Sequence, residues 1–549
     1  MQPVLIVGAG PVGQIAALML SRQGISSVLI DRRSSTLMAP KAHAVNPRTL
    51  EICESLGVSA DRIRALGASA NDAGMVYFVA TLTGIEFGAL PYERQGLETL
   101  ADTPYPLTNI PQPLFEAELT AAIAGDANVT FHRGIQCDDL QVSADRVNAT
   151  LRNLASGAVS EQSFDYVIAA DGARSRTRQR LGITMAGPEV LQNYLMIHFT
   201  ADLSHLTEAR KGLLYFLFEP GVNGVLIAYD RAHTWVLMHP LKGADKDVTS
   251  YDDAQYQALI EQAVGCPVSA TVENVTPWSM SAQVAEQYRA GRVFLAGDAA
   301  HRFPPAGGLG LNTGIVDAQN LTWKLAAVLK GKAGAGLLDT YEQERQPVAR
   351  TNSTQSLANS ARLADLRLAL MGSDRALAAQ HYAAVAAAPA DFPALARAVE
   401  AQRPHFDSFN LQLGYRYNSS AIHNPSPVPT APDVSRYQPS WQVGAHFPHR
   451  QVRLAGKEMA LLRCLPVDRF SLLCGPEAEV SNDLEDCSVF TFGQDFEDQQ
   501  DWQSLTGLPD SGALLIRPDG HIAARFDDTR AGFGAVISTV FEQLLAKGA

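Results

Sequence analysis

The chain has 549 residues, which is too long for one hydrophobic core and predicts three or four domains. Hydrophobic residues make up 46% of it and charged residues 18%, with no run of 18 uninterrupted apolar residues, so we expect a cytoplasmic protein without a membrane segment or signal peptide. The formal net charge of −13 argues against nucleic acid as a partner. The six cysteines form no CxxC pair, so we expect reduced thiols and neither a disulfide framework nor a metal site.

The N-terminal segment has the pattern of a βαβ unit. Residues 4–7 are an apolar strand-like run, residues 8–13 are a glycine-rich turn, residues 14–22 have helical spacing, and residues 28–30 read as the next strand. Such a unit predicts an open parallel sheet. Further strands are expected at 129–132, 147–151 and 164–170.

Residues 191–240 differ from this pattern because they are dense in aromatic and strand-forming residues, which predicts an inserted antiparallel sheet. The run 293–296 returns to the parallel sheet. Helices are expected at about 312–330 and 338–370, with an alanine-rich helix continuing to about 402.

Five prolines among polar residues mark 405–441 as a linker. A small α/β unit is expected beyond it. Its predicted strands are 459–465, 470–474, 489–492, 513–516 and 521–526, followed by a helix near 535–545.

Three glycine-containing turns carry the chemistry of the sequence. Gly8, Gly10 and Gly13 form GxGxxG between a strand and a helix, where bare backbone N–H groups and the helix dipole can meet a pyrophosphate. Asp31 ends the next strand, 21 residues after Gly10, where it can accept hydrogen bonds from a ribose. A tight turn without a ligand is the alternative for this motif taken alone.

The other two turns each follow an apolar strand. Asp171–Arg178 has the form DGxxSxxR, which alone would fit a surface turn. Asp298 precedes a glycine-rich run and can bind a polyol chain, while the N–H groups of 308–312 can face a flavin pyrimidine. The structural alternative is a plain strand-to-helix turn capped by Asp298.

The chain resembles the class A flavoprotein aromatic hydroxylases, in particular their phenol and polyketide hydroxylase branch, and the resemblance covers the whole chain. The residues that carry it are the three glycines with Asp31, Arg48–Glu51, Gln112 with Glu116 and Leu119, Asp171–Arg178, Gly297–Lys324, Tyr341 with Glu344–Arg345, Tyr415–Tyr417 and Leu515–Gly520.

The resemblance implies an α/β fold with a Rossmann-like FAD-binding domain of the GR2 type, an inserted antiparallel substrate sheet and a C-terminal thioredoxin-like domain. It implies domain bounds of 1–180 with 281–365 for FAD, 181–280 for substrate with 76–100 joining its sheet, 366–430 for a helical segment and linker, and 431–549 for the thioredoxin-like domain. This last domain would act in structural support or in a homodimer, since it lacks CxxC.

The resemblance also implies hydroxylation of a phenolic or polyketide-type ring with NADPH or NADH and O2, through a flavin C4a-hydroperoxide. The family carries an arginine where this chain has Lys41, which keeps the charge but loses the bidentate fork. The residues expected to contact FAD are Gly8, Gly10, Pro11, Val12, Gly13, Asp31, Arg32, Lys41, Arg48, Gln112, Asp171, Gly172, Asp298, Pro305, Gly308, Gly310, Leu311 and Asn312.

The carbonyl of Pro305 is expected, by resemblance, near the reacting ring. Tyr215, Tyr229 and His239 are candidates to bind or deprotonate a substrate hydroxyl, although a buried tyrosine or histidine with an ordinary partner is the alternative for each, so no base is assigned. Two other functions remain open: Baeyer-Villiger insertion on the same fold, and a flavin-binding protein without turnover.

Overall fold

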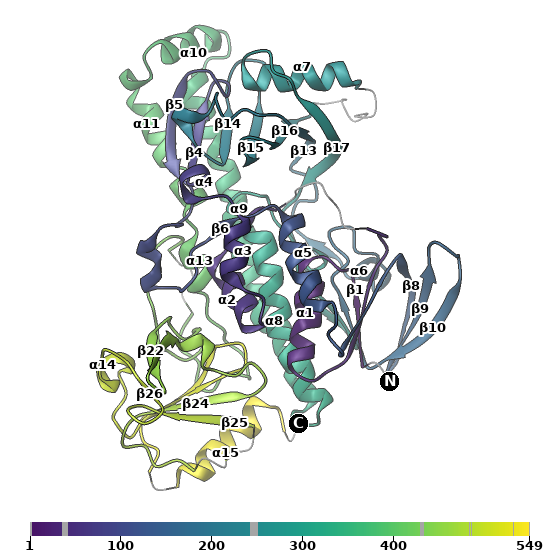
Figure 1. Ribbon diagram of the computed structural model, residues 1–549, viewed down its shortest axis with the longest axis vertical. Coiled ribbons are helices and arrows are strands. Elements are labelled where there is room, and N and C mark those ends of the chain that lie inside the picture. The colour runs from purple at the N-terminus through teal and green to yellow at the C-terminus, as the bar shows by residue number, and fades with distance from the viewer. Residues whose placement is uncertain are drawn as a thin grey trace.

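The computed structural model describes residues 3–35, 42–241, 251–428, 433–481, 484, 486–530 and 532–547. These residues form three parts stacked along the long axis of the molecule (Figure 1). A large, mainly antiparallel sheet lies at one end, a parallel sheet lies in the middle, and a small α/β unit lies at the other end. The long helices α8 (Leu309–Leu329) and α9 (Thr340–Met371) connect these parts.

The middle part is built on a six-stranded sheet in the order β19-β20-β11-β1-β2-β7. Its strands are β1 (Val4–Val7), β2 (Ser27–Asp31), β7 (Val129–Arg133), β11 (Tyr166–Ala169), β19 (Arg289–Ala290) and β20 (Val293–Leu295). All neighbours are parallel except β19 with β20. Helices α1 (Pro11–Arg22), α5 (Gln112–Ile123) and α8 cover one face of it and residues 135–164 cover the other, so β1, β2 and β11 are buried along their whole length.

The large sheet has seven strands in the order β17-β13-β16-β15-β14-β4-β5. Its strands are β4 (Met75–Val79), β5 (Glu86–Pro91), β13 (Gln192–Thr200), β14 (Leu214–Leu217), β15 (Gly224–Asp230), β16 (Thr234–Pro240) and β17 (Thr271–Met280). The chain enters this sheet twice, once through 75–91 and again through 192–280. All pairs are antiparallel except β4 with β14.

Both faces of this sheet are covered. One face packs against α7 (Asp253–Val264), whose Tyr256 and Ile260 lie among the buried residues of that side. The other face packs against α9, α10 (Ala378–Ala387) and α11 (Pro393–Glu400). The expected continuous helix to residue 402 is therefore wrong, because α9 stops at Gly372 (φ +72°) and the chain turns back on the sheet in short helices.

The C-terminal unit contains a four-stranded sheet in the order β25-β24-β27-β28, in which only β24 and β25 are parallel. Its elements are β22 (Gln451–Leu454), β23 (Lys457–Ala460), β24 (Phe470–Cys474), β25 (Cys487–Thr491), β26 (Phe496–Glu497), β27 (Ala513–Ile516), β28 (Ile522–Phe526), α14 (Trp502–Thr506) and α15 (Phe533–Leu544). The strand expected over 459–465 ends at Ala460, where a 3-10 helix follows.

The expected linker is a packed segment in its described part. It contains α12 (Arg403–Phe406) and α13 (Phe409–Leu413), and Tyr417, Ala421 and Ile422 are each about 1% exposed. Its prolines interrupt regular structure, yet its apolar side chains are buried between the middle part and the C-terminal unit.

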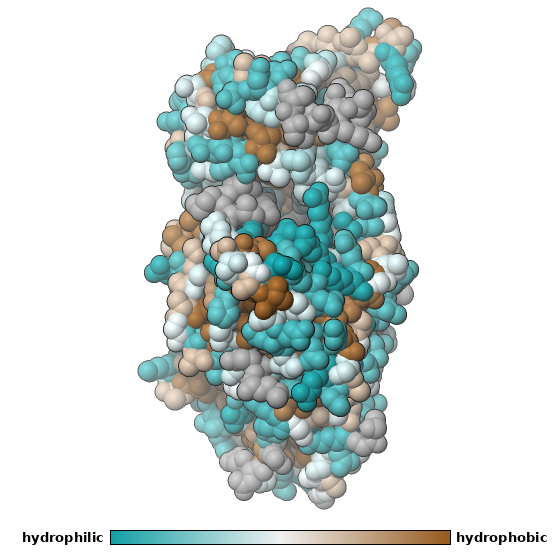
Figure 2. Space-filling model, turned by 90° about the vertical axis from the view of Figure 1, so that its right-hand side faces the viewer, coloured by the Kyte–Doolittle hydropathy of each residue, from teal (hydrophilic) through white to brown (hydrophobic). Residues whose placement is uncertain are grey.

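The remaining elements lie around the parallel sheet, except for α4 (Ala70–Ala73), whose Ala73 lies in the buried cluster of the large sheet. They are α2 (Pro47–Ser55), α3 (Ala60–Leu66), α4, α6 (Arg176–Arg180), β3 (Ala44–Val45), β6 (Thr108–Asn109), β8 (Ile135–Val142), β9 (Val147–Asn153), β10 (Val159–Phe164), β12 (Met185–Ala186), β18 (Gln283–Ala285) and β21 (His301–Arg302). Figure 2 shows a broad hydrophilic area across the middle of one face, with apolar residues in small separate groups. None of the helices in the described part of the chain combines the length and apolarity needed to cross a bilayer.

Candidate functional site

The predicted turns meet at one edge of the parallel sheet. Strands β20, β11, β1 and β2 are neighbours, and Gly297–Asp298, Asp171–Gly172, Gly8–Gly13 and Asp31 lie at their carboxyl ends. In an open parallel sheet this edge is where ligands bind. The structure therefore brings together residues that are almost 300 positions apart in the sequence.

The first turn depends on Gly8 and Gly13, where a side chain would not fit. Gly8 has a φ of +106°, and a Cβ placed on Gly13 would lie 1.9 Å from the carbonyl oxygen of Gly8. A Cβ placed on Gly10 would have no atom within 4 Å, so the turn is open at that residue. Gly10 is the N-cap of α1 and supplies no side-chain cap, with Pro11 as the first helical residue. The N–H groups of this helix end are therefore suited to hold a pyrophosphate.

Asp31 is buried and closes the same turn from the neighbouring strand. It accepts hydrogen bonds from the backbone N–H of Ala9 at 2.9 Å and of Arg33 at 2.8 Å, and from the Arg33 side chain at 3.2 Å. Burial raises the pKa of Asp31, but these hydrogen bonds outweigh it and leave the pKa below its ordinary value. Arg32 beside it is exposed.

The Asp171–Gly172 turn offers an acceptor that the protein itself does not use. Oδ2 of Asp171 accepts the backbone N–H of Thr177 at 3.1 Å, whereas its buried Oδ1 has no hydrogen-bond partner among the described residues. Arg178 ties this turn to the Gly297 turn by donating to the carbonyl oxygen of Ala299 at 2.9 Å. A buried carboxylate oxygen without a donor fits a site that a polar ligand completes.

The Gly297–Asp298 turn is held by contacts with α1 and α8, while the side chain of Asp298 is exposed. A Cβ on Gly297 would lie 3.0 Å from Val12 of α1, so the first and third turns pack directly on each other. The N–H of Gly297 donates to Asp317 Oδ2 at 3.1 Å, and Asp317 also pairs with His301 at 2.7 Å and Arg345 at 2.8 Å. The side chain of Asp298 is exposed at this edge.

The start of α8 is a second helix end without a side-chain cap. Its N-cap is Gly308, at a φ of +61°, and a Cβ there would lie 3.0 Å from Ala44 of β3. Gly310 has open space where a Cβ would be, and Leu311 is half-buried. Pro305 is exposed, and its carbonyl oxygen accepts the N–H of Gly308 at 3.1 Å.

Asn312 has a structural side chain. Its amide donates to the carbonyl oxygens of Ala44 at 3.0 Å and Gly308 at 2.8 Å, and its Oδ1 accepts from the Asn46 N–H at 3.0 Å. The contacts with Ala44 and Asn46 tie α8 to the segment that contains β3. A contact of Asn312 with a cofactor would therefore involve its backbone.

Three other predicted cofactor contacts have different surroundings. Gln112 accepts the N–H of Ala42 at 3.2 Å and donates to Glu116 at 2.7 Å, so it holds the segment before β3. Arg48 is 3% exposed and donates to Glu51 at 2.5 Å and to His446 of the C-terminal unit at 2.8 Å. Lys41 lies outside the described residues.

Of the three substrate candidates, only Tyr229 lies on the sheet face that is continuous with this site. Tyr229 belongs to the buried cluster that contains Ala44 and Tyr92. Tyr215 lies on the opposite face, where it stacks on Tyr77 at 5.5 Å and donates to the carbonyl oxygen of Arg210 at 2.6 Å.

His239 lies on the same opposite face as Tyr215. It pairs in register with Leu195, which is buried under α7. The structure thus does not bring Tyr215 and His239 to the turns that carry the cofactor motifs.

Two residues of the site were not predicted. Tyr92 follows β5, and its hydroxyl lies 3.6 Å from the Cβ position of Gly308. His43 precedes β3, and its ring centroid lies 5.8 Å from those of both Tyr92 and Tyr229. Neither residue belongs to a motif, and β3 pairs with β6 over two residues, which is too short for a periodic signal.

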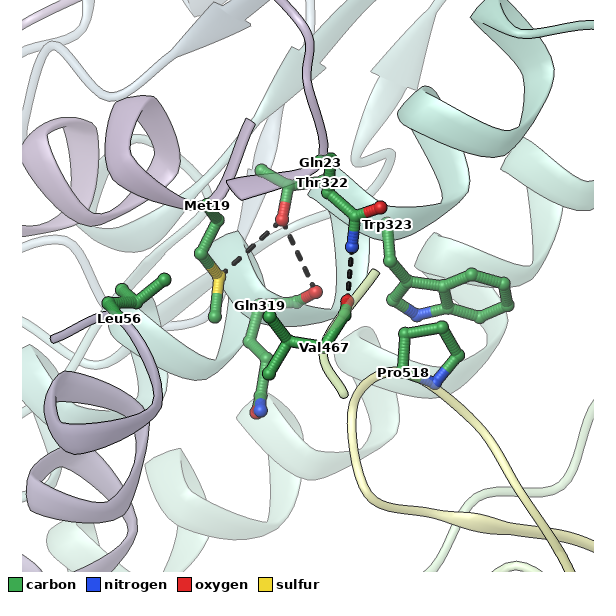
Figure 3. A pocket seen from close by; sticks show the side chains of 8 residues that line it. All are labelled: Met19, Gln23, Leu56, Gln319, Thr322, Trp323, Val467 and Pro518. Atoms are coloured by element: carbon green, nitrogen blue, oxygen red, sulfur yellow. Dashed lines mark hydrogen bonds between the residues drawn. The ribbon is translucent and has the colours of Figure 1, made fainter. Parts of the chain in front are cut away.

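Several of the residues that carry the family resemblance form a buried charge cluster. Glu344 on α9 accepts from Lys324 at 2.7 Å and from Arg517 at 2.6 and 2.9 Å, while Arg517 also pairs with Asp519 of the C-terminal unit. The small pocket in Figure 3 lies beside this cluster, where Met19 of α1 and Trp323 of α8 face Val467 and Pro518. It contains none of the cofactor turns and marks the junction of the parts.

Comparisons with known proteins agree with this geometry. Residues 1–356 match the family described as FAD binding domain, and residues 440–543 match the family described as aromatic-ring hydroxylase, C-terminal. The chain is 31% identical to tetracenomycin B2 monooxygenase-dioxygenase of Streptomyces olivaceus, over 99% of each chain. It is 29% identical to 2,4-dichlorophenol 6-monooxygenase of Delftia acidovorans, over 99% of this chain and 98% of the relative.

Among solved structures, the flavin-dependent monooxygenase PieE in complex with FAD and substrate matches with a TM-score of 0.91 and 32% identity, over 98% of this chain and 99% of that one. A family match over more than half of the chain, with relatives of similar length, covers the cofactor turns and the C-terminal unit together. The chain therefore belongs to the class A flavoprotein aromatic hydroxylases and is an FAD-dependent monooxygenase.

Proposed function

We propose that this enzyme hydroxylates a phenolic or polyketide-type aromatic ring, with O2 and NADPH or NADH as co-substrates. The observation that carries the proposal is the convergence of the three turns and the uncapped start of α8 on one sheet edge, next to Tyr92 and Tyr229. The names of the relatives, which act on a tetracenomycin and on 2,4-dichlorophenol, support an aromatic substrate.

Different residues of the site would bind different parts of FAD. The start of α1 with Gly8–Gly13 would hold the pyrophosphate, and Asp31 would bind the adenosine ribose. Asp171 and Asp298 would bind the remaining polar part of the FAD molecule. The N–H groups at the start of α8 would face the flavin ring. When bound, FAD would carry electrons from NAD(P)H to O2 and so activate the oxygen, which no amino-acid side chain can do.

The protein orients the substrate and excludes water. The buried cluster around Tyr229 presents an apolar wall that includes Val236, Met238 and Phe216. Such a wall positions a flat ring and keeps the reactive oxygen species away from solvent. Tyr215 and His239 are left out of the proposed site because they lie on the other face of the sheet.

The domain division is also a proposal. FAD binding is assigned to 1–180 with 281–365, substrate binding to 181–280 together with 76–100, and a helical segment and linker to 366–430. We propose a thioredoxin-like domain at 431–549, supported by the strand order β25-β24-β27-β28 with β24 and β25 parallel and by α15 following β28.

This domain would contribute stability, or contacts in a homodimer, and no electrons. Its three cysteines are free, and burial raises the pKa of Cys474 and Cys487 to about 12. A thiol that stays protonated at neutral pH is a poor redox group. The six free cysteines of the chain support a reducing compartment such as the cytoplasm.

A screen of phenols for stimulated NAD(P)H oxidation, followed by mass spectrometry in labelled dioxygen, tests the proposal. We expect one heavy oxygen atom in the product ring and an intact ring. A product with an inserted ring oxygen would indicate Baeyer-Villiger chemistry instead. NAD(P)H oxidation that no phenol stimulates, together with no labelled product, would leave a flavin-binding protein without turnover.

A further inference from the structure

His43 occupies the junction between the cofactor edge and the substrate sheet. The next residue, Ala44, contacts the Cβ position of Gly308 at 3.0 Å, so the imidazole is one residue away from the start of α8. Tyr229 lies edge-on to the imidazole, with ring centroids 5.8 Å apart and an interplanar angle of 83°. Tyr92 flanks it at the same distance. The imidazole therefore lies between the start of α8 and the substrate sheet.

Asn109 orients this ring. Nδ1 of His43 lies 3.0 Å from Oδ1 of Asn109, and in the tautomer with its hydrogen on Nδ1 the ring donates to this oxygen. Asn109 is 2% exposed, and its backbone is held by the pairing of β3 with β6 and by the N–H of Ala68 at 2.8 Å. The described hydrogen bond thus uses Nδ1 and leaves the lone pair of Nε2 for a ligand, on a side chain that is only half-buried.

The surroundings keep this ring neutral. Burial lowers the pKa of His43, and the hydrogen bond with Asn109 offsets the effect only in part. The titratable groups packed against it, Tyr92 and Tyr229, have pKa values that burial raises, so both stay uncharged. Glu93 follows Tyr92, but its carboxylate is engaged with Ser408 and Gln412. A neutral imidazole with a free Nε2 is the form in which histidine accepts a proton.

We propose that His43 binds the hydroxyl of the phenolic substrate through Nε2 and takes its proton. This proposal rests on the proposed function and assigns the proton acceptor of that reaction. The phenolic O–H bond breaks, an Nε2–H bond forms, and the electron pair stays on the oxygen, which makes the ring electron-rich enough to attack activated oxygen. When the hydroxylated ring regains aromaticity, the C–H bond at the hydroxylated carbon breaks and its proton leaves to solvent, while the imidazolium returns the first proton to the phenolic oxygen, so His43 ends each turnover neutral.

Binding without turnover gives the first test, with the oxidised FAD-loaded enzyme and no nicotinamide nucleotide. The probes are 2,4-dichlorophenol and its methyl ether, 2,4-dichloroanisole, which lacks the donor hydrogen. We expect the wild type to bind the phenol about tenfold more tightly than the ether, as one hydrogen bond to a well-placed acceptor allows. His43→Phe keeps an aromatic ring between Tyr92 and Tyr229 and should bind the two probes within about twofold of each other.

Turnover gives the second test. His43→Phe should lower the hydroxylation rate at neutral pH about a hundredfold, as is typical for loss of a general base. The difference in hydroxylation rate between His43→Phe and the wild type should be smaller at alkaline pH, because the phenol ionises in solution there and needs no proton acceptor. Tyr215→Phe is the matched control, since Tyr215 lies on the far face of the sheet, and it should retain both the binding preference and the rate.

A second variant keeps the test informative if His43→Phe fails to retain FAD. Asn109→Ala preserves His43 but removes the acceptor for Nδ1–H, and it should reduce the preference for the phenol several-fold. If either folded variant keeps the wild-type preference for the phenol over the ether and the wild-type hydroxylation rate, the proposed role of His43 is overturned. A wild type that binds neither probe would overturn the seating of a phenolic ring at this junction, and absence of labelled product from every phenol would overturn the proposed function itself.

Discussion

The buried charge cluster at the junction of α8, α9 and the C-terminal unit gives a quantitative prediction through Glu344→Gln. Glu344 accepts hydrogen bonds from Lys324, Arg517, Asn320 and Ser419. The side chains of Glu344, Lys324 and Arg517 are fully buried, and that of Asp519 is 2% exposed. Two carboxylates thus balance two cations away from water, and the substitution leaves two cations facing one carboxylate.

The expected cost follows from this imbalance. Leaving a buried charge without its partner destabilises a protein by about 3–5 kcal/mol. The cost has an upper bound because Lys324 can lose its proton: burial already lowers its pKa to about 8, despite the attraction of Glu344. Neutralising a lysine of ordinary pKa at pH 7 costs about 5 kcal/mol.

The pH dependence of this effect has a definite sign. The pKa of Lys324 is lower in the folded protein than in the unfolded chain, so its stabilising contribution is present above the unfolded value and is lost as the pH falls through about 8. A neutral Lys324 no longer requires the negative charge of Glu344 as a partner. The destabilisation by Glu344→Gln should therefore be smaller at pH 9 than at pH 7.

Urea unfolding in saturating FAD, followed by tryptophan fluorescence, measures this loss. Trp323 reports on the cluster directly, because its indole N–H donates to Asp519 at 3.2 Å. Glu400→Gln is the matched control: it removes the same charge from an exposed pair with Arg403 and should cost less than about 1 kcal/mol. Equal losses for the two variants would refute the argument that burial gives the cluster its energetic weight.

Three further predictions concern the cofactor turn, a buried carboxyl and the thiols. Gly13→Ala should weaken FAD binding at least tenfold in fluorescence titrations, because its Cβ would lie 1.9 Å from Gly8 O; unchanged affinity would contradict the assigned turn. Burial raises the pKa of Glu93 to about 7, so stability that is fully present below its unfolded value is lost as the pH rises through 7. Glu93→Gln should therefore be less destabilising at pH 8 than at pH 5 in thermal melts, by about 2–3 kcal/mol, and an equal effect at both would rule out this titration. Cys474→Ala with Cys487→Ala should leave turnover per FAD unchanged, whereas a large loss in folded enzyme would assign these thiols to catalysis.

The cofactor edge could be predicted because its signals are local. A glycine turn between an apolar run and a helix, with an acid at the next strand end, is written in about 30 consecutive residues. The order of β1, β11 and β20 then brings the three turns together. Nothing comparable marks Glu344 and Arg517, which form an ion pair across 173 positions, so the sequence did not show that these residues join two parts of the molecule.

The facing of the substrate sheet could not be predicted, for a different reason. Along β14, Leu214 and Phe216 face one buried cluster while Tyr215 and Leu217 face the other. Both faces are apolar because helices cover both. The alternation of side chains along each strand therefore does not show which set faces the cofactor site. Tyr215 and Tyr229 are therefore equivalent in the sequence, and only the structure separates them.

Helix α8 gives the C-terminal unit a physical connection to the cofactor edge that requires no redox chemistry. The start of α8, at Gly308, faces the cofactor edge, Asp317 in its middle holds the Gly297 turn, and Lys324 near its end reaches Glu344 and the Arg517 cluster. These three contacts lie on one continuous helix of 21 residues. Because a packed helix moves as a unit, a displacement of the C-terminal unit at Arg517 must also displace the Gly297 turn or break the charge cluster. The charge cluster therefore couples the position of the C-terminal unit to the start of α8.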